Sequence, residues 1–223
     1  MNTQRTERIQ ALKEKMLAAP RFVSIEQARI ITRVYQENEG LSQARKRALS
    51  LKAALEEMKI AVDPQELIIG NRTSGVRAGV VFPESGDAWV ERELEDLPTR
   101  PQDPFQVRPE DIREFREKIY PYWQGRTMED AIQSRCGKEI AEISRVVKIN
   151  QTDHAQGHIC PDVSLWLEKG PAGLLAEARQ RRSQEDPQQR EFYDCMILTL
   201  EGACRFLERC AEAAEKTAET ASA

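Results

Sequence analysis

Apolar residues recur at the spacing of an α-helix along most of this chain, and proline or glycine interrupts them at intervals. Between Pro20 and Gly40, for example, the apolar residues Ala28, Ile31 and Tyr35 fall on one face of a helix. Because proline and glycine end helices, each interruption marks a boundary between two of them. The sequence predicts helices over 5–18, 24–39, 42–58, 87–96, 109–120, 127–136, 162–169, 171–182 and 188–220.

Three short apolar runs depart from the helical pattern and predict strands. Two of them, 66–70 and 78–82, flank a loop of polar composition at 71–77. The third, 146–150, leads into the most polar segment of the chain. The predicted fold class is therefore mainly α with a few short strands.

Charge and hydropathy exclude two classes of partner. The 223 residues include 33 Lys and Arg against 37 Asp and Glu, a net charge of −4, which removes the basic footprint of a nucleic-acid binder. No apolar run is long enough to cross a bilayer, and residues 1–5 lead into a charged helix instead of a signal peptide. We expect a cytoplasmic protein without nucleic-acid or membrane partners.

The cysteines do not suggest a metal centre. Their number is odd, no two of them form a C-x-x-C pair, and three lie on one predicted helix but point in different directions. We expect no metal site and no disulfide framework, and interpret the cysteines as reduced thiols that pack as small hydrophobic groups. The five are Cys136, Cys160, Cys195, Cys204 and Cys210.

A dense polar loop, 150–158, carries both histidines of the chain. A strand that fixes such a loop is the usual setting of a binding or catalytic site. The i,i+4 spacing of His154 and His158 would suit zinc on a helix, but Gly157 and the missing glutamate disfavour that reading. Two alternatives stay open: a surface loop with hydrogen-bonded histidines, or a substrate contact by His158.

Two arginines, Arg72 and Arg77, flank the loop at 71–77. Guanidinium groups suit carboxylate or phosphate oxygens, so both are weaker candidates for substrate binding. The alternative, which is more common for arginines in loops, is that they bind backbone carbonyls or carboxylates of their own fold.

Several segments, in this order, resemble the N-terminal part of the glycyl radical enzymes, the pyruvate formate-lyase-like lyases and dehydratases. The resemblance runs from about Arg8 to Thr217 and looks closer to the diol-dehydratase-like branch than to pyruvate formate-lyase itself. The segments that carry it are ELIIGNR at 66–72, RAG at 77–79, FPE at 82–84, LPTRPQD at 97–103, YWQGRT at 122–127, INQTD at 149–153 and GH at 157–158.

The resemblance implies a ten-stranded α/β barrel whose N-terminal third is largely helical, and a complete enzyme that is commonly a homodimer in anaerobic metabolism. In that family an S-adenosylmethionine-dependent iron–sulfur activase installs a glycyl radical, which passes to a cysteine that attacks the substrate. Residues 1–223 would be the N-terminal part of one such domain. Its regions would be a helical hairpin region at 5–62, a mixed strand and helix region with the polar loop at 63–160, and a helical region at 161–223.

The resemblance also implies site residues. The pair Gly157-His158 matches a segment whose histidine contacts a substrate hydroxyl in the glycerol dehydratase members. The predicted substrate contacts are His158, Gln156, Asp153 and Asp162, with Arg72, Arg77 and Asn150 as weaker candidates. Asp162 matches an acidic position of the same segment, where a structural role is also open.

Two motifs of the family do not occur in this chain: a Gly-Cys-x-Glu-like loop and an Arg-Val-x-Gly-Tyr-like loop. Cys136 is followed by Gly-Lys and Cys160 by Pro-Asp, so neither matches the thiyl cysteine. We therefore expect a truncated or split N-terminal segment that binds no cofactor itself and is inactive without the rest of the enzyme and its activase. The expected reaction of the complete enzyme is radical C–O cleavage of a small diol such as glycerol or propane-1,2-diol.

Two alternatives remain open at this point. One is another glycyl radical lyase, either formate acetyltransferase-like or one that cleaves a C–S or C–N bond. The other is a helical binding or assembly module without catalytic function.

Overall fold

The computed structural model describes residues 3–147, 160–184 and 187–221. The chain divides into two compact units. Unit 1 consists of Met1–Arg21, Arg33–Ala78 and Asp162–Ala223, and unit 2 of Phe22–Thr32 and Gly79–Pro161.

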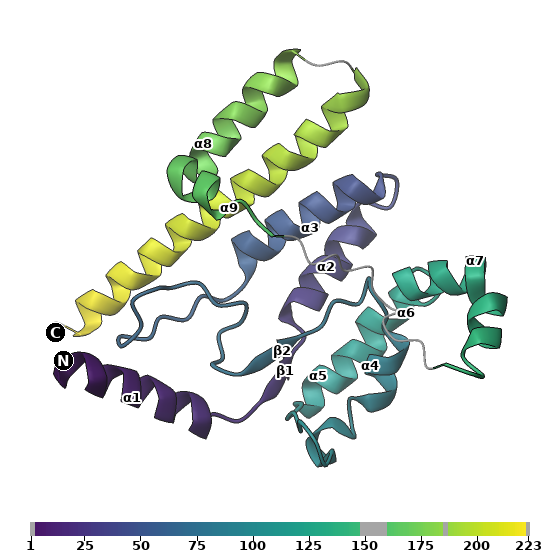
Figure 1. The fold of residues 1–223 in the computed structure, drawn as a ribbon, viewed down its shortest axis with the longest axis horizontal. Helices are drawn as coiled ribbons and strands as arrows, with labels where there is room; N and C mark the ends of the chain where they lie inside the picture. Colours follow the sequence, from purple (N-terminus) through teal and green to yellow (C-terminus); the bar gives the residue numbers. More distant parts are fainter. Residues whose placement is uncertain (1–2, 148–159, 185–186, 222–223) are drawn as a thin grey trace. The chain divides into compact units, whose positions relative to one another are not determined.

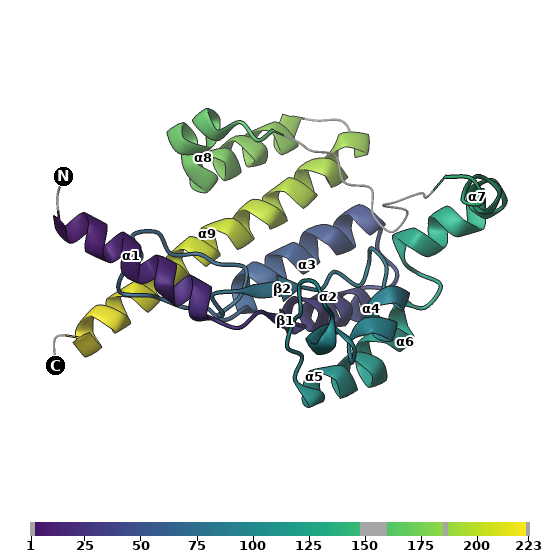
Figure 2. The ribbon, with the colours of Figure 1, turned by 60° about the horizontal axis from the view of Figure 1, so that its bottom comes forward.

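Unit 1 is built from helices. Helix α3 packs along α9, and α8 packs along another part of α9, so α9 is the centre of this unit (Figures 1 and 2). At the contact with α3, Gly202 of α9 comes so close that a Cβ atom there would lie 2.8 Å from the Cα of Lys52. The helices of this unit are α1 (Thr3–Ala18), the end of α2 (Glu26–Glu37), α3 (Gln43–Glu57), α8 (Val163–Gln184) and α9 (Pro187–Ala221).

A carboxylate joins the three packed helices. Glu201 of α9 accepts one hydrogen bond from Lys52 of α3 at 3.0 Å and another from Arg179 of α8 at 2.9 Å. These two cations hold the pKa of Glu201 below its usual value. The ionised carboxylate therefore helps to fix both neighbours of α9.

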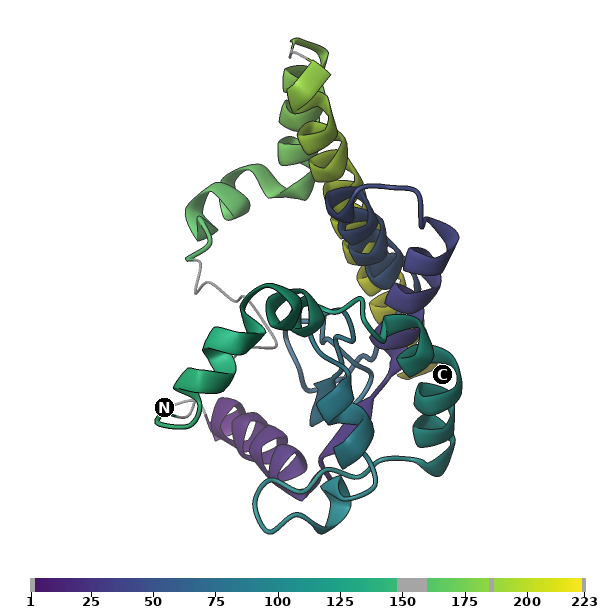
Figure 3. The ribbon, with the colours of Figure 1, turned by 90° about the vertical axis from the view of Figure 1, so that its right-hand side faces the viewer.

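Helix α8 bends partway along its length (Figure 3), and at the break Gly170 has a φ of 61° and a ψ of 174°. Glycine adopts this left-handed backbone without the clash that a Cβ atom would cause, and Pro171 then starts the second segment. The break confirms the two separate helices that the sequence predicts on either side of residue 170.

Unit 2 combines short helices with a two-stranded sheet of β1 (Phe22–Ser24) and β2 (Ala78–Val80). The indole of Trp123 is the largest fully buried side chain among its described residues, and Phe115, Ile119 and Leu94 are also fully buried. The remaining elements are the start of α2, α4 (Ala88–Glu93), the 3₁₀ turn η1 (Leu97–Thr99), α5 (Pro109–Glu114), the π-helical segment η2 (Phe115–Ile119), α6 (Tyr120–Trp123) and α7 (Met128–Ile143).

The predicted strand at 66–70 is wrong. The residues that suggested it are highly exposed, Leu67 at 81% and Ile68 at 85%, and a turn precedes them in which the Glu66 N–H donates to the Asp63 carbonyl. A β-branched run forms a strand only where another strand pairs with it, and none does so in the part of the chain that the structure describes.

The other strand predictions have mixed outcomes. The strand at 78–82 exists but covers only Ala78–Val80, and its partner β1 was not predicted. At 146–150, Val146 and Val147 lie in a turn and a bend, and the rest falls outside the described residues. The overall prediction of a mainly α fold with few strands is confirmed.

Candidate functional site

The predicted substrate loop falls almost entirely outside the described residues. Asn150, Asp153, Gln156 and His158 all lie between 148 and 159, as does His154 of the zinc alternative. Their roles stay predictions from the sequence.

Asp162 lies at the start of α8 and is the one strong site candidate that the structure describes. Its Oδ1 atom accepts a hydrogen bond from the Leu165 N–H at 2.9 Å, and its carbonyl accepts one from the Trp166 N–H at 3.1 Å. This is the geometry of a helix N-cap, which satisfies donors that the first turn leaves unpaired. Asp162 therefore has a structural role, and its contact with a substrate stays a prediction.

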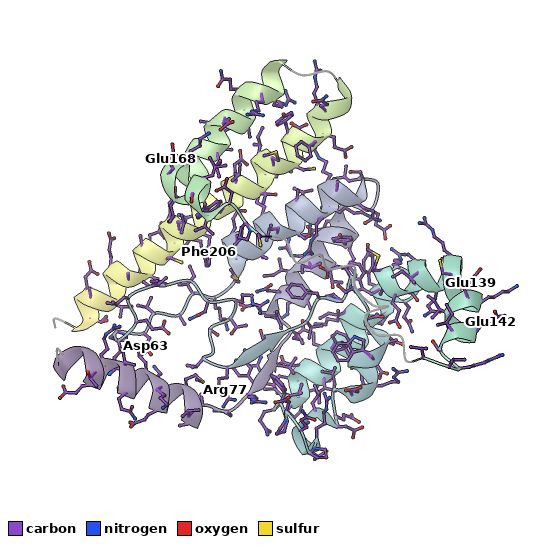
Figure 4. All side chains as sticks on the ribbon, in the orientation of Figure 1. Asp63, Arg77, Glu139, Glu142, Glu168 and Phe206 are labelled. Atoms are coloured by element: carbon purple, nitrogen blue, oxygen red, sulfur yellow. The ribbon has the colours of Figure 1, made fainter. Side chains whose placement is uncertain are left out.

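The two arginine candidates lie in the loop that precedes β2. The Arg77 guanidinium donates to the backbone carbonyl of Ala19 at 3.4 Å, so this side chain joins the loop to the end of α1 (Figure 4). Arg72 is exposed. Between them, Thr73 is buried and exchanges hydrogen bonds with the backbone of Gly75. The contact of Arg77 matches the fold-stabilising alternative, and a substrate role for either arginine stays a prediction.

The structure shows all five cysteines as free thiols, with Cys136 and Cys160 exposed and Cys210 buried. Burial raises the pKa of the Cys195 and Cys210 thiols, which keeps them protonated and weakly reactive near neutral pH. Among the described residues, no group of three or more His, Cys, Asp or Glu side chains is arranged to hold a metal ion.

Each unit has an apolar hollow among its described residues. In unit 1 a groove of about 630 Å³ lies among α3, α8 and α9, where Leu51, Leu174 and Met196 line it. In unit 2 a cavity of about 340 Å³ is lined by residues of β2 and α4, including Val80 and Trp89. None of the described candidates, Arg72, Arg77 and Asp162, lines either hollow.

Sequence reasoning missed one titratable group, Asp87, just before α4. It is only 3% exposed, and its Oδ2 atom is buried without a hydrogen-bond partner. Burial, with the nearby acidic groups of Asp130 and Glu129, raises its pKa to about 6, although two backbone N–H groups act in the opposite direction. An aspartate before a helix indicates only a cap, so the sequence carries no signal for this burial.

The family model "Pyruvate formate lyase-like" matches residues 2–223. The chain belongs to this family. It is 28% identical over 227 residues to (2S)-3-sulfopropanediol dehydratase of Klebsiella oxytoca, covering 95% of this chain and 27% of that enzyme.

Solved structures of this family share the fold. The chain matches the glycerol-bound form of the B12-independent glycerol dehydratase from Clostridium butyricum with a TM-score of 0.90 and 30% identity, covering 96% of this chain and 28% of that one. A glycyl radical enzyme from Archaeoglobus fulgidus matches with a TM-score of 0.89 and 26% identity. The predicted family and fold are confirmed, and the chain spans about a quarter of the length of the relatives that it matches.

The names of the relatives include both a dehydratase and a sulfite-lyase. Isethionate sulfite-lyase of Desulfovibrio desulfuricans is 27% identical over 233 residues, covering 96% of this chain and 28% of that enzyme.

No helix among the described residues is both long enough and apolar enough to cross a membrane.

Proposed function

We propose that this chain supplies the N-terminal part of a glycyl radical dehydratase that cleaves a C–O bond of a small diol. The observation that carries the proposal is the match to the glycerol-bound dehydratase structure over 96% of the chain. The similarity to a dehydratase of a sulfonated propanediol supports the same substrate class. Glycerol and propane-1,2-diol are the proposed substrates.

In this proposal the polar loop at 150–158 binds the hydroxyl groups of the diol. His158 contacts a substrate hydroxyl, as its match to the family segment implies, and its imidazole can donate or accept a hydrogen bond near neutral pH. Gln156 and Asp153 add polar contacts from the same loop. Asp162 supports this region at the start of α8, where it caps the helix.

The radical residues belong to the remaining part of the enzyme in this proposal. In the family the glycyl radical passes to a cysteine, and the resulting thiyl radical would abstract a hydrogen atom from the substrate. The cysteines of this chain do not fit the thiyl role, because Cys195, Cys204 and Cys210 lie within helix α9 and Cys136 lies within α7. Cys160 follows Ile159 where the family's motif has glycine, and two residues after it stands Asp162 in place of the glutamate, with its carboxylate capping α8.

The proposed partners are the remaining polypeptide of the enzyme, a radical S-adenosylmethionine activase and a second copy of the enzyme in a homodimer. The proposed location is the cytoplasm.

A second candidate is C–S cleavage of a sulfonate. It rests on the similarity to isethionate sulfite-lyase, which extends over 96% of this chain.

The test joins residues 1–223 to the remaining part of the Clostridium butyricum glycerol dehydratase and activates the product. The glycyl radical is measured by electron paramagnetic resonance, and turnover is measured with glycerol, propane-1,2-diol and isethionate. We expect a radical and diol dehydration in the joined enzyme, and no radical in the 223-residue chain alone. A radical on the chain alone, or a radical in the joined enzyme without diol turnover, would contradict the proposal.

A further inference from the structure

Helix α7 of unit 2 has an unusual attachment. None of its 16 residues is buried, and side chains such as Glu139 and Glu142 are exposed (Figure 4). Its N-cap Thr127, in contrast, is only 4% exposed. The burial that holds α7 in place is therefore concentrated at its N-terminal end.

Two backbone hydrogen bonds connect this end to the turn before α4. The Met128 N–H donates to the Glu84 carbonyl at 2.9 Å, and the Glu129 N–H donates to the Ser85 carbonyl at 3.0 Å. The first-turn donors of a helix have no acceptor within the helix, so the turn at 84–85 supplies what α7 itself lacks. Breaking these two bonds would release the first turn of α7.

Asp87 is buried in the same turn and faces acidic groups. Its Oδ2 atom has no hydrogen-bond partner, and the charged groups that act on it, Asp130 and Glu129, both lie in the first turn of α7. A buried carboxylate without a cation is costly, whereas the neutral acid is tolerated. The ionised form of Asp87 therefore disfavours the arrangement that buries it.

We propose that protonated Asp87 holds the first turn of α7 against the turn at 84–87, and that ionisation of Asp87 releases it. Release lets water reach the carboxylate and moves the two acidic side chains of α7 away from it. The attachment of α7 is then a pH-dependent switch within unit 2, and it is independent of the proposed enzymatic function.

The direction of the pH effect follows from the pKa of Asp87. Burial raises it from 3.8 to about 6 in the attached state. An acid whose pKa is raised in the attached state stabilises that state while the acid is protonated. This stabilisation is complete below about pH 4 and is lost as the pH rises to about 6. The difference of about two pKa units corresponds to a total shift of about 100-fold, of which about tenfold falls between pH 5 and pH 7.

The test measures hydrogen exchange of the Met128 and Glu129 amides by NMR in the 223-residue chain, corrected for intrinsic exchange rates. We expect their protection to fall about tenfold from pH 5 to pH 7 in the wild type. In Asp87→Asn, which cannot ionise, protection should be high and independent of pH. The exposed Asp96 in the same unit provides the control, and Asp96→Asn should behave like the wild type.

Two results would overturn the proposal. One is protection of these amides that does not change with pH in the wild type, or that changes equally in Asp87→Asn. The other is a midpoint near 4 in a carbon-detected titration of the Asp87 carboxyl. This measurement needs only the wild type, so the test stays valid if Asp87→Asn does not fold.

Discussion

At the scale of single residues, the core of unit 2 depends on a buried polar pair. The Trp123 Nε1–H donates to the Thr32 hydroxyl at 2.8 Å, and this hydroxyl donates to the Ala28 carbonyl at 2.7 Å. Trp123 is 2% exposed and Thr32 is 3% exposed, so water cannot replace either partner. The hydroxyl thus lets α2 and α6 pack with every polar atom of the pair satisfied.

Thr32→Val tests this pair. Valine has nearly the same shape but leaves the indole N–H buried without an acceptor, so we expect the free energy of unfolding to fall by about 1–3 kcal/mol. Thr32→Ser keeps the hydroxyl and provides the control. Denaturant titration measures both variants, and a loss for Thr32→Val no larger than that for Thr32→Ser would refute this reading.

At the scale of elements, α9 is fixed by one close backbone approach and one shared carboxylate. Gly202 admits the backbone of α3, and Glu201 joins α3 and α8 through Lys52 and Arg179. Glu201 and Gly202 are adjacent in the sequence but take part in different contacts, so a separate substitution tests each of them.

Gly202→Ala places a Cβ atom 2.8 Å from the Cα of Lys52, which cannot move as a flexible side chain can. We expect a net loss of about 1–3 kcal/mol in thermal or denaturant unfolding, because this clash exceeds the gain in helix propensity. Gly137→Ala on exposed α7 is the matched control, since its nearest neighbour is the mobile end of Gln133. The control should be neutral or slightly stabilising, and equal effects at both positions would count against the close packing.

Glu201→Gln tests the shared carboxylate and its pH dependence. Because the folded-state pKa of Glu201 is lowered, its contribution is present above its usual pKa of about 4.5 and is lost as the pH falls. We expect Glu201→Gln to reduce the free energy of unfolding by about 1 kcal/mol at pH 7 and to have little effect at pH 3.5. Glu208→Gln, whose exposed partner Arg205 lies on the same helix, should have a smaller effect at pH 7.

The elements also show what sequence could and could not predict. Helix boundaries that depend on local sequence signals were predicted well. Gly170 ends the first part of α8, and Thr127 starts α7 with a complete capping box. The strand at 66–70 was predicted wrongly because β-branched composition does not reveal whether a partner strand is present. The raised pKa of Asp87 was missed because burial and the acidic groups of Asp130 and Glu129, about forty residues further along the chain, set it.

At the scale of the whole molecule, the family membership rests on the match of residues 2–223, and the proposed chemistry rests on one loop. That loop was found from its composition and its family resemblance, since the two histidines of the chain occur there. Its geometry could not be predicted, because polar loops take their shape from the structure that surrounds them. The proposal that this chain contacts the substrate therefore needs a functional test.

The most direct test replaces His158 with alanine in the joined and activated enzyme and measures kcat/KM for glycerol. His154→Ala is the matched control, because it removes the only other histidine from the same loop. We predict that His158→Ala lowers kcat/KM at least tenfold, as expected for a lost contact to a substrate hydroxyl, while the glycyl radical signal and the His154→Ala enzyme stay normal. Wild-type turnover by His158→Ala would contradict the claim that this chain supplies a substrate contact.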